Sequence, residues 1–227
     1  MQKKCGAVIV AAGSGKRMGG NISKQFLSIG EKPIIVHTVG KFEKVREIDE
    51  IIVVTSLLYM KYVQDLKKEF GWKKVTIVEG GKERYNSVLN GLYALSKDTE
   101  TVLIHDGVRP FVTEKNILDV IEKTQQTGAC ILAVPVKDTI KAVDENGIVR
   151  GTPDRNTLWS VQTPQGFKFD LLKKAYESVE NFEAVTDDAM VMEKAGYSVA
   201  VVMGSYQNIK ITTPEDLTIG TAMEIEI

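Results

Sequence analysis

The fold is decided near the start of the chain by residues 8–26, which read VIVAAGSGKRMGGNISKQF. An apolar run ends in a turn of small residues, and Lys16, Arg17 and Lys24 follow within a few positions. A buried strand that leads into glycines and positive charge is typical of a loop that binds phosphate, because small residues let backbone N–H groups approach the anion. The stretch therefore predicts an α/β protein with a phosphate-binding loop.

The two familiar loops of this kind do not fit. The Walker pattern would need a glycine at Val10 and a hydroxyl at Arg17, and the dinucleotide pattern would need its third glycine at Met18. A P-loop NTPase and a Rossmann dehydrogenase are therefore disfavoured. A third type of phosphate loop is expected, and a simple strand-to-helix turn with solvated lysines is the alternative.

Apolar runs alternate with segments of helical period through the first 135 residues. The runs occupy residues 6–12, 50–56, 75–81, 101–107 and 129–135, and helical spacing occurs at 84–95 and 113–127. Successive apolar residues are typical of strands in a parallel sheet that is covered on both faces. The alternation predicts a doubly wound, mostly parallel, Rossmann-like α/β sheet that binds ligands beyond the carboxyl ends of its strands.

The pattern changes after Pro135. Residues 136–165 contain short alternating runs around Asn146-Gly147, a strong hairpin signal. We expect an inserted β-arm of about 25 residues, at about 136–160, within a single domain spanning 1–227. The arm is too short to have its own core, so it should pack on the parent sheet or on another subunit. The α/β pattern then resumes with helices at 168–178 and 186–195, a strand at 198–203 and a final helix opened by Thr213-Pro214.

Composition excludes several classes of protein. The 29 Lys and Arg residues nearly balance 30 Asp and Glu residues, so no basic field favours nucleic acid or an anionic membrane. Cys5 and Cys130 lie in apolar runs, as small buried hydrophobic residues in a reduced compartment do. No apolar stretch approaches the roughly 20 residues of a membrane span. We expect a cytoplasmic protein.

A series of motifs along the chain carries a resemblance to a known family. These motifs are AAGSGKRMG with SKQF, GGKERYNSV (80–88), HDGVRPF (105–111), PVKDTIK (135–141), DRNTLWSVQTPQGF (154–167), TDDA (186–189) and NIKITTPEDL (208–217). Together they resemble the sugar and polyol phosphate nucleotidyltransferases and, within them, the 2-C-methyl-D-erythritol 4-phosphate cytidylyltransferase family, over essentially the whole chain. One departure is Gly107, where the family pattern has alanine.

The resemblance implies an enzyme that joins CTP to a polyol phosphate and releases pyrophosphate, in non-mevalonate isoprenoid synthesis. A substrate phosphate oxygen attacks the α-phosphorus in line, so catalysis consists of aligning two polyanions and offsetting the charge that develops. Such a reaction needs many cations and Mg²⁺ but no Ser-His-Asp set. The sequence agrees, and two histidines with two scattered cysteines make a zinc site improbable.

The resemblance also implies roles for individual residues. The nucleotide would be bound by Ala11, Ala12, Gly13, Ser14, Gly15, Gly80, Gly81, Lys82, Ser87, Asp106 and Gly107. The charges that act on the transferring phosphate would come from Arg17, Lys24, Arg155 and Lys210, and the polyol phosphate would contact Arg109, Thr139, Arg155, Thr163, Thr186 and Lys210. Asp106 ends a strand at the ligand edge, where a carboxylate suits Mg²⁺.

Structural readings compete with several of these assignments. Ser87 could be a first-turn helix hydroxyl, Thr186 the N-cap of the next helix and Arg109 a brace for its loop. Arg84 could bind a phosphate or pair with an acidic neighbour, and His105 is expected to be structural. Lys210 is harder to dismiss, since we expect it in a strand between two isoleucines, at the edge of the site.

Arg155 lies in the arm, which is an unusual place for a substrate-binding arginine. We therefore expect a homodimer in which the arm reaches the partner's site. A cytidylyltransferase for another polyol phosphate, such as ribitol 5-phosphate, is the closest alternative function. A non-catalytic nucleotide sensor is the alternative from another class, and it predicts loss of Lys24, Asp106 or Lys210, all of which are present.

Overall fold

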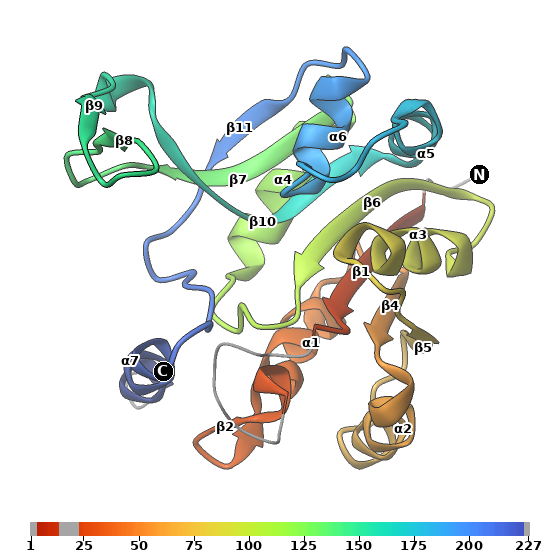
Figure 1. The fold of residues 1–227 in the computed structure, drawn as a ribbon. Coiled ribbons are helices and arrows are strands. Elements are labelled where there is room, and N and C mark those ends of the chain that lie inside the picture. Colours follow the sequence, from red (N-terminus) through yellow and green to blue (C-terminus); the bar gives the residue numbers. More distant parts are fainter. Residues whose placement is uncertain (1–3, 14–22, 225–227) are drawn as a thin grey trace.

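The computed structural model describes residues 4–13 and 23–224, and its described strands form a seven-stranded sheet that confirms the predicted α/β architecture (Figure 1). In spatial order the strands are β11 (Ala200–Met203), β7 (Ala129–Pro135), β10 (Trp159–Lys168), β6 (Thr99–Asp106), β1 (Lys4–Ala11), β4 (Glu50–Thr55) and β5 (Val75–Glu79). β10 runs antiparallel to both of its neighbours, whereas the other strand pairs of this sheet are parallel. The sheet is therefore mostly parallel but mixed.

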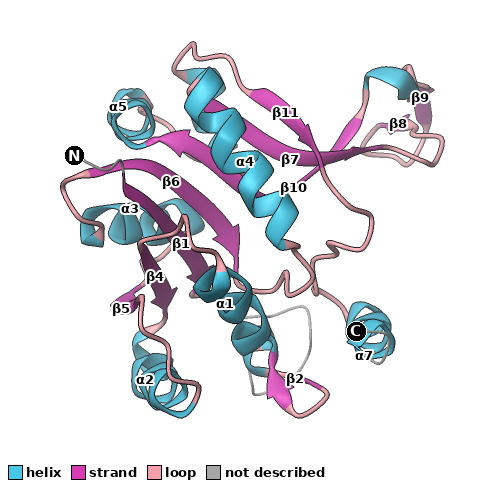
Figure 2. Ribbon diagram, turned by 180° about the vertical axis from the view of Figure 1, so that it is seen from behind, coloured by secondary structure: helices cyan, strands magenta, loops and turns pink. Residues whose placement is uncertain are grey.

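Helices cover both faces of the sheet (Figure 2). One face carries α1 (Ile34–Lys44), α2 (Met60–Glu69) and α4 (Glu114–Thr127), and the other carries α3 (Arg84–Ala94), α5 (Phe169–Ser178) and α6 (Asp188–Lys194). The last helix, α7 (Pro214–Glu224), packs near the short hairpin of β2 (Ser28–Ile29) and β3 (Lys32–Pro33). Short 3-10 turns lie at 24–26, 57–59 and 155–157.

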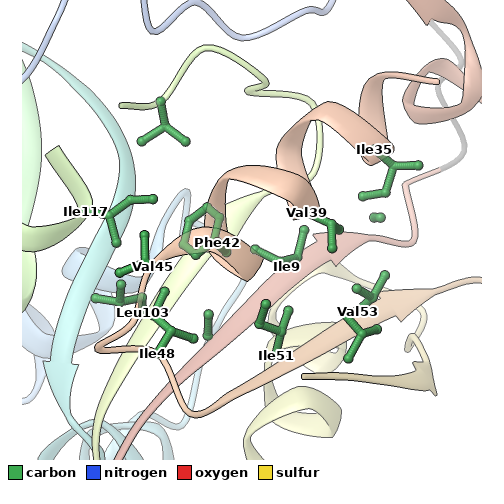
Figure 3. Packing of buried hydrophobic residues seen from close by; sticks show 14 of the residues in the cluster. Ile9, Ile35, Val39, Phe42, Val45, Ile48, Ile51, Val53, Leu103 and Ile117 are labelled. Atoms are coloured by element: carbon green, nitrogen blue, oxygen red, sulfur yellow. The ribbon is translucent and has the colours of Figure 1, made fainter. Parts of the chain in front are cut away.

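Alternate residues of each central strand feed two cores. In β1, Ala7 and Ile9 face the first core, and Val8 faces the second. Figure 3 shows the first core, where Phe42 and Val39 of α1 lie over Ile9 and Leu103. Because both faces are covered, the strands are apolar on successive residues, which is the signal that predicted them.

Helix ends follow their sequence signals. Thr113 caps α4, as its position before Glu114 predicts, and its hydroxyl accepts a hydrogen bond from the Asn116 N–H at 3.1 Å. At the start of α7, the Asp216 N–H donates to the Thr213 hydroxyl at 3.3 Å, and the Thr213 N–H donates back to the Asp216 carboxylate at 2.9 Å. This reciprocal pair is a capping box.

β10 corrects the prediction for the region after Pro135. We expected residues up to about 160–165 to belong to the arm, but Trp159–Lys168 is a ten-residue strand inside the main sheet. Pro164 within the run argues against a central strand, because proline cannot donate to the ladder. The strand accommodates it where its register with β7 shifts between Gln162 and Gln165.

Between β7 and β10 the chain leaves the sheet and forms a small hairpin of β8 (Ala142–Val143) and β9 (Val149–Gly151), visible at the edge of Figure 1. The turn lies where Asn146-Gly147 predicts it. Gly147 has φ of 78°, a left-handed conformation that favours glycine. The Asp144 side chain accepts hydrogen bonds from the Asn146 and Ile148 N–H groups at 3.0 and 2.9 Å.

Candidate active site

The carboxyl ends of β1, β5 and β6 meet around a cavity of about 360 Å³. It is lined by Val10, Ala11, Ala12, Gly13, Lys24, Gln25, Gly81, Lys82, Glu83, Arg84, Ser87, Asp106, Val108 and Lys210. Ligands bind at this edge in doubly wound sheets. The lining comes from residues 10–13, 24–25, 81–87, 106–108 and 210, and the described residues among them include four cationic side chains.

Asp106 is the acidic centre of the cavity. The residue is only 7% exposed, and its carboxylate faces three cations. Lys210 Nζ lies 2.8 Å from Oδ2, Arg109 Nε lies 3.4 Å from Oδ2, and Arg84 Nε lies 3.9 Å from Oδ1. Arg84 also pairs with the Asp188 carboxylate at 2.6 Å, so these three cations face two carboxylates. One excess positive charge remains, which suits an anionic ligand.

Burial alone would raise the pKa of the Asp106 carboxyl, but the charges of Lys210, Arg84 and Arg109 outweigh it and hold the pKa well below its ordinary value. The neighbouring His105 is fully buried, and burial lowers its pKa to about 4. At neutral pH, Asp106 is therefore an anion and His105 is uncharged.

Lys210 reaches Asp106 from a segment that is not a strand, which corrects our expectation for residues 209–211. The segment is tied to the loop after β6 by a hydrogen bond from the Ile211 N–H to the Val108 carbonyl at 2.9 Å. That bond, together with burial of Ile211 in the cluster under α7, places Lys210 over the cavity.

The glycines of residues 80–81 are required by close packing. A Cβ on Gly80 would lie 2.4 Å from Cβ of Ala12, and a Cβ on Gly81 would lie 2.2 Å from Cβ of Asn86. The Ser87 hydroxyl accepts from the Gly81 N–H at 3.1 Å and donates to the Glu83 carbonyl at 3.2 Å. Ser87 therefore shapes this loop as well as lining the cavity with Gly81 and Lys82, whereas Gly80 packs beneath the lining.

The start of the phosphate loop forms another part of the cavity lining. Ala11, Ala12 and Gly13 line the cavity, and Gln25 holds their backbone by donating from Nε2 to the carbonyls of Ala11 at 2.6 Å and Gly13 at 3.2 Å. Lys24 also lines the cavity. The predicted residues Ser14, Gly15 and Arg17 lie outside the described residues.

Comparison with known proteins decides the family. Residues 5–224 match the sequence profile of 2-C-methyl-D-erythritol 4-phosphate cytidylyltransferase. The chain belongs to this family. A relative with that name from Alkaliphilus metalliredigens is 53% identical over 220 residues, with 96% of this chain and 91% of the relative covered. Another, from Clostridium botulinum strain ATCC 19397, is 49% identical, with 96% of each chain covered.

Solved structures agree with this assignment. The crystal structure of 4-diphosphocytidyl-2C-methyl-D-erythritol synthase from Anaerococcus prevotii superposes with a TM-score of 0.86 at 36% identity, covering 98% of this chain and 99% of that one. The Francisella tularensis 2-C-methyl-D-erythritol 4-phosphate cytidylyltransferase gives 0.82 at 32% identity, covering 97% and 99%. The mixed seven-stranded sheet is therefore the fold of the cytidylyltransferase family.

Three of the residues suggested by the family motifs lie beneath the cavity surface. Arg109 and Thr163 are buried, and neither is part of the lining. The Thr163 hydroxyl contacts the Asp106 N–H and His105 Nδ1, each at 3.0 Å. Gly107 donates to the Val10 carbonyl at 2.9 Å and accepts from the Thr38 hydroxyl at 3.0 Å. Their polar groups are already engaged by the protein.

Three other motif residues are exposed away from this cavity. Arg155 lines a second pocket at the base of the arm, with Lys137 and Trp159, and donates to the Lys137 carbonyl at 2.8 Å. Thr139 lies in the exposed connection from β7 to the arm. Thr186 is exposed, and Asp187 rather than Thr186 caps α6.

Arg84 is a cavity residue that the predicted site did not include. It begins α3 directly after the 80–83 loop, and its Nη2 lies 2.6 Å from Oδ2 of the fully buried Asp188. A basic residue in the first turn of a helix is unfavourable for the helix dipole. That signal in the sequence, at a strand-to-helix loop on the ligand edge, could have identified it.

A metal would find two carboxylates in the described lining, the buried Asp106 and the exposed Glu83. Among residues 4–13 and 23–224, no group of three His, Cys, Asp or Glu side chains could hold an ion. Mg²⁺ commonly binds through one or two carboxylates and completes its shell with substrate phosphates and water. The Asp106 carboxylate, whose Oδ1 has no cation closer than Arg84 at 3.9 Å among those described, fits a Mg²⁺ ion that arrives with a nucleotide.

Proposed function

We propose that this chain transfers the cytidylyl group of CTP to 2-C-methyl-D-erythritol 4-phosphate, giving 4-diphosphocytidyl-2-C-methyl-D-erythritol and pyrophosphate in non-mevalonate isoprenoid synthesis. The observation that carries the proposal is Asp106 with Lys210 and Arg84 in a cavity formed by the family motifs. The names of the relatives identify the substrate, and the cavity provides the positive charge that two phosphorylated substrates need.

The reaction is a direct in-line displacement. A phosphate oxygen of the polyol phosphate attacks the α-phosphorus of CTP, the bond to the bridging oxygen breaks, and pyrophosphate leaves with that bond's electron pair. The attacking oxygen is already anionic at neutral pH, so no general base is required. The protein's contribution is to align the two anions and to stabilise the charge on the transferring phosphoryl group.

The lining residues divide this work. Residues 11–13 and 81 would approach the nucleotide with small side chains and backbone groups, while Lys24, Lys82 and Lys210 bring positive charge to the cavity. Arg17, outside the described residues, joins Lys24 in this role by family resemblance. Asp106 would hold Mg²⁺, which would neutralise phosphate charge when bound.

Lysine substitutions test this division. Lys24→Ala and Lys210→Ala should each lower kcat by about 100-fold, because they remove charge aimed at the transition state, while the Kd for CTP changes by about threefold or less. Turnover is measured by pyrophosphate release, and CTP binding by calorimetry. Lys82→Ala is the control within the same cavity lining, and it should affect CTP binding more than turnover. Normal turnover in Lys24→Ala would disprove the role of that residue.

The activity itself is tested with a substrate panel. Purified protein with CTP and Mg²⁺ should release pyrophosphate with 2-C-methyl-D-erythritol 4-phosphate and form the CDP-alcohol. Ribitol 5-phosphate is the decisive comparison, since a cytidylyltransferase for that polyol remains the alternative. A kcat/KM that favours ribitol 5-phosphate would replace the proposed substrate.

We also propose that the chain is a homodimer joined through the arm. The arm and the adjoining end of β10 expose apolar side chains, with Val143, Ile148 and Val149 each more than half exposed. Exposed apolar patches are typical of interfaces. Arg155 and Thr139 do not line their own chain's cavity, so a role on substrate requires that the arm cross to a partner. Light scattering should give twice the mass of one chain, and a fully active monomer would refute the proposal.

A further inference from the structure

Gln25 is a buried side chain that joins the two ends of the phosphate loop, residues 11–13 and 23–26. The residue is 2% exposed and lies in the 3-10 turn at the far end of the loop. Its Nε2 donates to the carbonyl of Ala11 at 2.6 Å and to that of Gly13 at 3.2 Å. An amide nitrogen carries two hydrogens and a carbonyl oxygen can only accept. These contacts therefore fix the orientation of the Gln25 amide and occupy both of its donors.

The two carbonyls matter because residues 11–13 line a cavity that carries excess positive charge. A carbonyl oxygen is the negative end of its peptide dipole, so it repels a phosphate. The Gln25 amide offsets that charge and holds both oxygens on itself. The N–H and C=O of a trans peptide point in opposite directions, so the Ala12 N–H, which shares a peptide with the Ala11 carbonyl, is turned away from Gln25. Gln25 thus determines which backbone groups this segment presents to an anion.

The far end of the loop is anchored by aromatic side chains. The Ser23 N–H donates to the Tyr59 hydroxyl at 3.3 Å. The ring of the buried Phe26 lies 4.4 Å from that of Tyr59 and 5.3 Å from that of Tyr62, measured between centroids. Tyr59 ends the 3-10 turn after β4 and Tyr62 belongs to α2, so this end of the loop is fixed to the chain that follows β4.

Lys24 lies between these two anchors. Tyr59 holds the residue before it, and the Gln25 contacts tie the residue after it to the start of the loop. The turn itself is closed by a hydrogen bond from the Phe26 N–H to the Ser23 carbonyl at 2.9 Å. The Lys24 side chain lines the cavity together with residues 11–13. Loss of the Gln25 contacts would therefore free both the carbonyls and the backbone that carries Lys24.

We propose that Gln25 is a positioning residue for nucleotidyl transfer. It fixes the backbone of residues 11–13 for the triphosphate and places Lys24, and it acts through these groups instead of through contact with the substrate. The consequence for turnover rests on the proposed function, but the anchoring of the loop does not.

Two variants separate this role from a general loss of stability. Gln25→Met keeps the length of the side chain and removes both donors. Thr124→Val is the control, because Thr124 is fully buried and its hydroxyl donates to a carbonyl, that of Val120 within α4 at 2.7 Å, outside the cavity lining. The ligand-free proteins are compared by the carbonyl-carbon NMR shifts of Ala11 and Gly13, CTP binding by calorimetry and kcat by pyrophosphate release.

Positioning predicts that Gln25→Met shifts both carbonyl resonances in the absence of ligand. The Kd for CTP should rise about fivefold, since the carbonyls are no longer held, and kcat should fall about 10-fold, since Lys24 is misplaced. Thr124→Val should leave all three readouts near wild type.

A double-mutant cycle with Lys24 tests the link to that residue. In a Lys24→Ala background, Gln25→Met should lower kcat by about twofold or less, because the charge that Gln25 places is already gone, while its effect on the Kd for CTP should persist. A full 10-fold fall in that background would show that Gln25 acts independently of Lys24 and would overturn the proposal.

Unchanged Ala11 and Gly13 resonances in Gln25→Met would also overturn it, because a residue that only contacts substrate leaves the ligand-free backbone as it was. If Gln25→Met does not fold, Gln25→Asn keeps the buried amide on a shorter side chain that cannot reach both carbonyls, and the same readouts decide. If the wild-type protein shows no turnover with CTP and polyol phosphate, the proposed function fails, while the carbonyl resonances and the Kd for CTP still test the anchoring by Gln25.

Discussion

The burial of His105 makes the stability of the protein depend on pH. Burial lowers its pKa to about 4 from an ordinary 6.5. The unfolded chain therefore binds this proton more readily than the folded protein, so the stability from this group is complete above pH 6.5 and is lost as the pH falls toward 4. The shift corresponds to about 3 kcal/mol of unfolding free energy.

We expect the wild-type protein to lose this increment between pH 6.5 and 4 relative to His105→Gln, which cannot titrate there. Urea unfolding at a series of pH values measures the difference. The carboxylates titrate in both proteins, so only the gap between the two curves reports on His105. Parallel curves would show that the folded imidazole keeps an ordinary pKa.

Asp188 is a second buried group whose partners are fixed. It accepts from Arg84 Nη2 and from the Tyr176 hydroxyl, each at 2.6 Å. Asp188→Ala leaves a partly buried guanidinium and a buried hydroxyl without their partner, and should lower the unfolding free energy by about 3 kcal/mol. Tyr176→Phe removes only one hydrogen bond and should cost about 1 kcal/mol. Equal losses in the two variants, measured by urea unfolding, would show that the Arg84 pair contributes nothing.

At the scale of elements, α3 and α1 each contain a glycine, but packing requires only the one in α3. A Cβ on Gly91 of α3 would lie 2.4 Å from Cγ1 of Val8 and 3.0 Å from Cγ2 of Val54, so the helix can approach β1 and β4 only with glycine there. A Cβ on Gly40 of α1 would meet nothing within 4 Å outside its own helix backbone and chain neighbours.

The same substitution should therefore have opposite effects in the two helices. Gly91→Ala should destabilise the protein by about 1–3 kcal/mol through overpacking, although alanine favours helix. Gly40→Ala should stabilise it by up to about 1 kcal/mol, because helix propensity acts without a clash. Thermal unfolding of both variants checks the pair. A stabilising Gly91→Ala would mean that α3 can move away from the sheet.

Elements were predictable from sequence where one local signal dominated. β1, β4, β5, β6 and β7 are continuous apolar runs, and α4 and α7 begin at their cap residues. β10 was not predicted, because its first three residues are exposed and Pro164 interrupts it. Its place between β6 and β7 depends on long-range pairing, which leaves no local pattern.

At the scale of the whole molecule, the proposed dimer predicts complementation between inactive variants. Asp106→Asn damages the cavity and Arg155→Ala damages the arm, so each homodimer should be inactive. If each arm acts on the partner's cavity, one site of the mixed dimer combines an intact cavity with an intact arm. Mixing the refolded variants should therefore restore about a quarter of wild-type activity, on the statistics of random pairing with one intact site in two. No recovery in confirmed mixed dimers would mean that Arg155 acts within its own chain or not at all.

In the part of the chain that the structure describes, no helix is long and apolar enough to cross a membrane.

The sequence by itself determined the α/β architecture, the ligand edge, and the residue types that gather there. Apolar runs and helical periods act locally, and a strand followed by glycines and cations needs no tertiary information to be recognised. Only the tertiary structure decided which polar groups face the cavity and which lie beneath it. Thr163, Arg109 and Lys210 all belong to the family motifs. Thr163 and Arg109 are nevertheless buried and hydrogen-bonded within the protein, whereas Lys210 lines the cavity. Their difference arises from contacts between β6, β10 and the segment before α7, which are brought together only when the sheet has formed.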